Sequence, residues 1–183
     1  GLSILQDVIA TGGFITGSLS YRKQTPVYRK AQDSLHDIDV VYPLSAHDWH
    51  TKHPYWRASK KVSDDKKLSN DQLIEKVKEL YPISQLLQRQ PNMQIMWVYP
   101  DADNNVVINA IVCEDPALIE KFKNLKGNYN ARLKNLTTEE KQKIHLVDIF
   151  LHKEGDIASD YITDNEFNLK LTHYKHSFKA KLK

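Results

Sequence analysis

Residues 36–41 read His-Asp-Ile-Asp-Val-Val, so two acids interrupt an otherwise apolar run. The β-branched residues in this run favour a strand, and we expect one that begins at Asp37. Side chains two residues apart on a strand point to the same face. Asp37 and Asp39 are therefore predicted to lie side by side, while Ile38 between them points to the opposite face. The stretch predicts a strand that is acidic on one face and apolar on the other.

Two carboxylates this close repel each other, and each raises the other's pKa unless a cation lies between them. A divalent metal ion with oxygen ligands is such a cation, and magnesium suits paired carboxylates together with substrate phosphates. The alternative is a strand end with two solvated acids that pair with lysines. The Asp-x-Asp spacing alone does not distinguish a metal site from this alternative.

A third acid, Asp148, stands in the middle of the β-type run Ile-His-Leu-Val-Asp-Ile-Phe-Leu at residues 144–151. A buried charge is costly unless it is paired or bound to a metal ion. Apolar neighbours on both sides favour a buried position for Asp148 over an edge strand whose aspartate faces water. We therefore expect Asp148 to be paired or bound to a metal ion.

The rest of the chain alternates between helical and β-type patterns, with glycine, proline and capping residues at the boundaries. Helices are predicted at Leu2–Ala10, after a cap at Ser69 or Asn70, from Ile83 to about Arg89, from Pro116 to Gly127, around 138–143 and over 166–183; strands are predicted at 14–16, 37–42 with an end at Pro43, 94–99, 106–113 and 144–151. This order predicts an α/β (α+β) fold, a mixed β-sheet flanked by helices.

The composition fits a single domain over residues 1–183, with a core at about 2–151 and a basic, helical C-terminal segment at 152–183. Hydrophobic residues make up 40% and charged residues 27% of the 183 residues, which excludes a disordered chain. No apolar run is long enough to cross a bilayer, so no membrane partner is expected. Cys113 is the only cysteine, which excludes an internal disulfide and favours a cytoplasmic protein.

The short run Phe14-Ile15-Thr16 ends in the turn Gly17-Ser18. The chain thus contains three motifs in a fixed order: a strand that ends in Gly-Ser, a second strand with Asp-x-Asp, and a later strand with one more aspartate. This pattern resembles the nucleotidyltransferases of the DNA polymerase beta superfamily. The resemblance covers roughly residues 2 to 151 and rests on the order and strand context of three short motifs.

The resemblance implies a metal-dependent enzyme that transfers a nucleoside monophosphate from a nucleoside triphosphate to an acceptor and releases pyrophosphate. Asp37, Asp39 and Asp148 would be the catalytic residues and would hold two magnesium ions, for which manganese is a substitute. The nucleotide-binding residues would be Gly17, Ser18, Arg22 and Lys23. The acceptor would be a protein side chain, an RNA end or a small molecule.

Two other functions fit the same residues. The gap between Ser18 and Asp37 is longer than in compact members of the superfamily, and the chain begins with Gly1 rather than Met. Both features are compatible with a non-catalytic binding or structural module of a larger protein or assembly. The basic tail from Lys170 to Lys183 is compatible with a nucleic-acid-binding domain, or with a plain solvated terminal helix.

His47, His50 and His53 recur every three residues, a spacing that metal ligands can have. No cysteine accompanies them, and Pro54 together with a polar context argues against a rigid helix that would align them. We therefore do not expect a zinc site in this segment.

Overall fold

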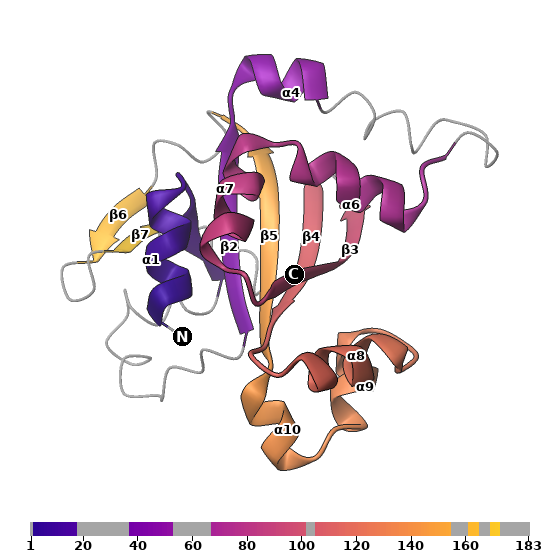
Figure 1. The fold of residues 1–183 in the computed structure, drawn as a ribbon. Helices are drawn as coiled ribbons and strands as arrows, with labels where there is room; N and C mark the ends of the chain where they lie inside the picture. Colours follow the sequence, from indigo (N-terminus) through magenta and orange to yellow (C-terminus); the bar gives the residue numbers. More distant parts are fainter. Residues whose placement is uncertain are drawn as a thin grey trace.

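The computed structural model describes residues 2–17, 37–52, 67–101 and 105–154, together with the backbone of two later strands. Seven strands form one sheet in the order β3-β4-β5-β2-β1-β7-β6 (Figure 1). Their bounds are β1 Phe14–Thr16, β2 Asp37–Leu44, β3 Met93–Pro100, β4 Val106–Val112, β5 His145–Lys153, β6 Tyr161–Asp164 and β7 Leu169–Thr172. The sheet is mixed and helices flank it, so the predicted fold class is confirmed.

The centre of the sheet is the parallel pair of β2 and β5, in which Ile38 stands opposite Val147. On one side, β4 pairs antiparallel with β5, and β3 pairs antiparallel with β4 as a hairpin. On the other side, β1 pairs antiparallel with β2 and parallel with β7. The two acid-bearing strands are therefore neighbours, although β3, β4 and several helices lie between them in the sequence.

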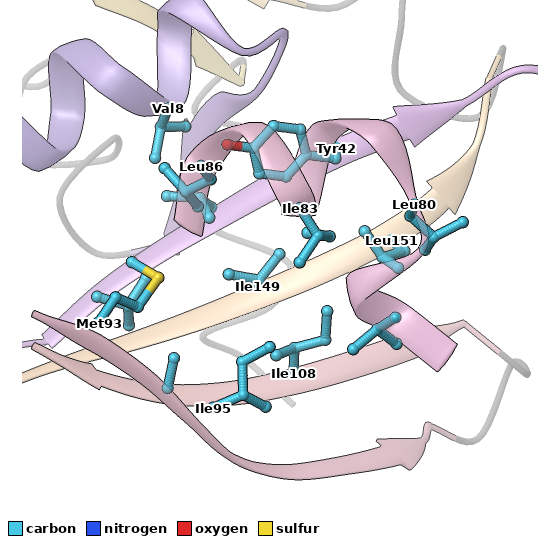
Figure 2. Close-up of a cluster of buried hydrophobic side chains, with 14 of the residues drawn as sticks. Val8, Tyr42, Leu80, Ile83, Leu86, Met93, Ile95, Ile108, Ile149 and Leu151 are labelled. Carbon is cyan, nitrogen blue, oxygen red and sulfur yellow. The ribbon is translucent and has the colours of Figure 1, made fainter. Parts of the chain in front are cut away.

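Three helices cover one face of the sheet: α1 (Leu2–Ala10), α6 (Asn70–Lys78) and α7 (Tyr81–Arg89) (Figure 1). Ile83 and Leu86 of α7 lie over Ile149 of β5 in the close-up of the core (Figure 2). Burial of one such side chain contributes roughly 1.5–3 kcal/mol. Ile38, Val40 and Ile108 belong to the same cluster and are fully buried. This face is the main hydrophobic core.

Three further helices, α8 (Pro116–Asn124), α9 (Tyr129–Lys134) and α10 (Thr138–Lys143), lie together beyond one end of β4 and β5 (Figure 1). They form a second hydrophobic cluster with residues from the opposite face of the sheet, including Ile111 and Leu146. Each helix begins at a side-chain cap, in turn Asp115, Asn128 and Thr137. Such caps satisfy amide groups that would otherwise lack a partner in the first turn.

Among the described residues, a helix is present at each of the predicted places except the C-terminal segment, and a strand at each of the five predicted places. The helix predicted from Pro116 to Gly127 ends at Asn124, and the helix predicted from Ile83 begins at Tyr81. Ser69 rather than Asn70 caps α6, with a capping box to Gln72. The helix α9 and the helix α4 (Ala46–Lys52) were not predicted. None of the helices among the described residues is long and apolar enough to cross a membrane.

Two expectations about the strands and the tail are wrong. The first concerns β2, which does not stop at Pro43 but continues to Leu44, because β1 pairs with β2 only as far as Val41. Beyond that point the side of β2 that faces β1 needs no amide donor, so a proline is tolerated.

The second concerns the C-terminal segment, which is not helical throughout, because Leu169–Thr172 forms the strand β7 and pairs with β1 at Ile15 and Leu171. The sequence there, Leu-Lys-Leu-Thr, alternates apolar and polar residues, as strands do. The sheet therefore extends beyond the core predicted at 2–151. Residues 173–183, which complete the predicted basic helix, lie outside the described residues.

Candidate metal centre

The pairing of β2 with β5 brings the three predicted acids together. Asp39 stands directly opposite Asp148 in the parallel register, and Asp37 lies two residues earlier on the same face of β2. One carboxylate oxygen from each of Asp37, Asp39 and Asp148 lies within 4.8 Å of the others. Within the described part of the chain, no other group of three acids, histidines or cysteines is arranged in this way. The expectation that the three acids converge is confirmed.

The acids belong to a row of side chains that crosses five strands on one face of the sheet. In the strand registers, Trp97, Asn109, Asp148, Asp39 and Thr16 stand opposite one another in turn. Side chains directly opposite on neighbouring strands lie on the same face and contact each other. This face is the reverse of the one that α1, α6 and α7 cover.

The environment of the acids opposes their ionisation. Burial raises the pKa of Asp39 to about 7, and the charges of Asp37 and Asp148 add to the rise. Burial also raises the pKa of Asp148 to about 6, although a hydrogen bond from Asn109 acts to lower it. Asp37 is the most exposed of the three, and partial burial of its carboxylate still raises its pKa.

Asp39 and Asp148 also share a side-chain hydrogen bond, which raises the pKa of Asp39 and lowers that of Asp148. Two carboxyl groups can be joined in this way only when one of them carries a proton. A divalent cation can take the place of that proton and relieve the like-charge repulsion. The donor set, three carboxylates and no sulfur or nitrogen, fits a hard cation such as magnesium or manganese.

Gly17 is the one predicted nucleotide-binding residue that the structure describes. It follows Thr16, whose register partner is Asp39, and its φ is +67°, in the left-handed region that favours glycine. A methyl group on its Cα would overlap the carboxylate of Asp39. The turn therefore passes close beside the acids. Ser18, Arg22 and Lys23 lie outside the described residues.

Tyr129 of α9 closes the opposite side of the site. Its hydroxyl donates to the carbonyl oxygen of Ala110 at 2.9 Å, and its ring contacts Trp97 edge-on, with 5.2 Å between centroids. Burial raises the pKa of Tyr129, and the charges of Asp148 and Asp37 raise it further. The guanidinium of Arg132 lies 4.6 Å from the centroid of the Trp97 ring. The acids thus lie between the aromatic edge at α9 and the turn at Gly17.

Sequence reasoning missed Asn109, which donates from its side-chain nitrogen to Asp148 Oδ1 at 2.7 Å. The signal was present, because a single polar residue interrupts the apolar strand Val-Val-Ile-Asn-Ala-Ile-Val. The same argument identified Asp148 in its own strand. Only the register between β4 and β5 shows that the two residues are partners.

The expectation that no helix aligns the histidines is wrong for two of them, because His47 and His50 lie on α4. The helix forms because Trp49, only 5% exposed, anchors it to the main core. Both histidines are exposed, and neither belongs to a group of candidate metal ligands among the described residues. His53 lies outside the described residues.

A groove of about 700 Å³ lies along the outer edge of β3 and is lined by Trp97, Arg132 and residues of α6, among others. It contains none of the three acids. Among the described residues, this groove therefore lies at the edge of the sheet and apart from the three acids.

No protein-family model matches the chain, and neither a curated protein nor a solved structure shows significant similarity to it. Any assignment of function therefore depends on the geometry of the site.

Proposed function

We propose that the chain is a metal-dependent nucleotidyltransferase, which transfers a nucleoside monophosphate from a nucleoside triphosphate to an acceptor. The observation that carries the proposal is the convergence of three carboxylates from β2 and β5 within 4.8 Å, beside a glycine turn. The pattern of a Gly-Ser turn, Asp-x-Asp and a later aspartate, which resembles the DNA polymerase beta superfamily, supports it as well.

Asp37, Asp39 and Asp148 would hold magnesium, which supplies positive charge to the attacking and leaving oxygens of an in-line displacement. An oxygen of the acceptor forms a bond to the α-phosphorus, and the bond from that phosphorus to pyrophosphate breaks. The proton of the attacking hydroxyl passes to Asp148 and then to solvent. The deep strand position of Asp148, fixed between β4 and β2, keeps this carboxylate in one place.

The turn at Gly17 would receive the triphosphate, because a glycine lets the backbone approach a phosphate closely and its free N–H groups are anion donors. Ser18, Arg22 and Lys23, which follow the turn in sequence, would add a hydroxyl donor and positive charge. The proposal includes a cytoplasmic setting, in keeping with the single free cysteine, Cys113.

The proposal is tested by incubating the protein with each α-labelled nucleoside triphosphate and magnesium. Candidate acceptors are the protein itself, RNA ends and small hydroxyl compounds. We expect Asp39→Asn to reduce labelling on the order of 1,000-fold, because loss of a metal ligand removes several kcal/mol of transition-state stabilisation. The matched control is Asp71→Asn, since Asp71 is an exposed aspartate on α6, and it should leave labelling unchanged.

If none of the four triphosphates labels an acceptor and none binds in the presence of magnesium, the proposal fails. Nucleotide binding without transfer would instead favour the non-catalytic module. A steep salt dependence of oligonucleotide binding, without labelling, would favour a nucleic-acid-binding domain.

A further inference from the structure

Asn109 is one of two polar residues buried in the described part of the chain, at 9% exposure. The other, Gln90, has a structural explanation on the opposite face, because its side chain donates to Asp7 Oδ2 at 2.6 Å. Asn109 lies in β4 between Ile108 and Ala110, both fully buried, and its own side chain points to the acidic face. A buried amide is costly unless its hydrogen bonds are made, so its partners explain its position.

The partner of Asn109 is Asp148, whose Oδ1 accepts a hydrogen bond from Asn109 Nδ2 at 2.7 Å. The amide nitrogen must face the carboxylate, because the amide oxygen and a carboxylate oxygen are both acceptors and repel each other. Tyr99 lies on the same face of the sheet, and its interaction with the Asn109 side chain acts to lower the Tyr99 pKa, against the larger rise from burial. The hydrogen bond to Asp148 thus sets the orientation of the amide.

This arrangement restricts how Asp148 can bind a cation. A carboxylate can ligate through one oxygen or through both, and here the Asn109 amide engages Oδ1, which favours Oδ2 as the ligand atom. Magnesium and manganese take six ligands in a tight octahedron at about 2.0–2.2 Å. Calcium takes 6–8 oxygens and readily accepts carboxylates through both oxygens. A carboxylate held to one oxygen therefore favours the smaller ions.

We infer that Asn109 is a positioning residue, which limits Asp148 to single-oxygen ligation and thereby makes the metal centre prefer magnesium and manganese over calcium. The inference rests on the metal centre of the proposed function. It adds a residue from a third strand, β4, that does not itself touch the metal ion.

The test measures the affinity of the whole chain for metal ions without any nucleotide. Mn²⁺ binding is followed by the electron paramagnetic resonance signal of the free ion, and Ca²⁺ binding by displacement of Mn²⁺. Two variants distinguish the role of the Asn109 hydrogen-bond donor from the role of its side-chain shape. Asn109→Leu removes the amide at similar volume, and Asn109→Asp keeps the shape but adds a fourth carboxylate. Asn70→Ala is the matched control, because Asn70 makes two hydrogen bonds to the backbone of β3 and none to the acids.

In Asn109→Leu we expect the Mn²⁺ affinity to fall roughly 10–100-fold, the range for loss of a hydrogen-bond partner to a metal ligand. The ratio of Mn²⁺ affinity to Ca²⁺ affinity should fall on the order of tenfold in Asn109→Leu, because Asp148 becomes free to ligate through both oxygens. It should also fall in Asn109→Asp, because calcium accommodates the additional oxygen ligands. In Asn70→Ala the ratio should equal that of the wild type, whatever happens to the melting temperature.

The outcomes separate this inference from the proposed function. If the wild-type chain binds Mn²⁺ and the ratio is unchanged in both Asn109 variants, the inference is overturned and the metal centre stands. If the wild-type chain does not bind Mn²⁺, the metal centre itself is lost, and both proposals fail with it. Should Asn109→Leu not fold, as judged by its melting curve, the ratio in Asn109→Asp decides alone.

Discussion

The two faces of β2 and β5 differ sharply, although the same two strands build both. On the face under α1, α6 and α7, Ile38, Val40, Val147 and Ile149 are no more than 1% exposed. On the reverse face lie three carboxylates, Asp39 and Asp148 between these residues and Asp37 just before Ile38. Burial and like-charge neighbours raise the pKa of both Asp39 and Asp148. The alternation of side chains along a strand thus separates the residues that stabilise the fold from residues that oppose it. A well-packed core allows the reverse face to hold like charges close together.

The largest effect should come from breaking the apolar face at a residue adjacent to an acid. We expect Ile149→Ala to lower the free energy of unfolding by about 2–5 kcal/mol, because it leaves a cavity in the main core. The measurement is denaturant unfolding of the metal-free chain. Asp148→Asn, one residue away on the other face, is the comparison and should not destabilise the metal-free chain. Equal destabilisation by both changes would contradict the division between the faces.

A substitution in the turn beside the acids should have a smaller effect on stability. Gly17→Ala places a side chain at a φ of +67°, which costs roughly 1–2 kcal/mol, and its methyl group overlaps the Asp39 carboxylate. We expect a lower melting temperature together with weaker Mn²⁺ binding. Gly12→Ala is the control, since Gly12 also has a positive φ of 96° but nothing lies within 4 Å of the added methyl group. A loss of Mn²⁺ affinity in both variants would show that backbone strain, rather than contact with Asp39, is the cause.

The acidic face should also make the stability of the metal-free chain depend on pH. In the folded chain the pKa of Asp39 is about 7 and that of Asp148 about 6, whereas the ordinary pKa of either carboxyl group is 3.8. A raised pKa means that the folded state binds more protons, so stability falls as pH rises from about 4 to about 7. We expect the melting temperature to fall by a few degrees across this window in a chelator, and saturating Mg²⁺ to remove most of the fall at pH 7. Asp39→Asn should flatten the profile, and a profile as steep as that of the wild type would argue against Asp39 as its source.

The smallest effect should come from a helix on the apolar side. Ser69→Ala removes the side-chain cap of α6, in which Ser69 Oγ accepts from the amide of Gln72 at 3.2 Å. We expect a loss of about 1 kcal/mol in the free energy of unfolding. Mn²⁺ affinity should not change, because α6 does not reach the acids. A change in that affinity would mean that the two faces are coupled.

Local sequence patterns predicted much of the difference between the two faces. Alternating residues in β2 predicted that Asp37 and Asp39 share a face, because strand periodicity fixes which side chains lie together. That Asp148 joins them was implied by the resemblance of the three motifs to the DNA polymerase beta superfamily, and not by any local pattern. Pairing partners are different, since they depend on register between distant strands. For that reason the sequence did not reveal that Asn109 stands opposite Asp148, nor that the C-terminal segment contributes β7.

Tertiary packing overrode local composition in the segment after β2. The polar residues around His47 and His50 gave no sign of a helix, and α4 forms because Trp49 is anchored in the core. The position of Pro43 within β2 is likewise explained by a distant segment. Proline lacks an amide N–H, and β2 tolerates this because β1 does not extend far enough to pair with it there. In each case the decisive partner is remote in sequence, and a pattern within one segment cannot supply it.

The pairing of Ile15 with Leu171 has a consequence for how the chain reaches its final form. During synthesis, β1 emerges well before β7, one of its two neighbours in the sheet. Contacts that span so much sequence are slow to form and leave strand edges exposed meanwhile. The strand that carries the Gly17 turn would thus be enclosed on both sides only after the segment that contains Leu171 has left the ribosome.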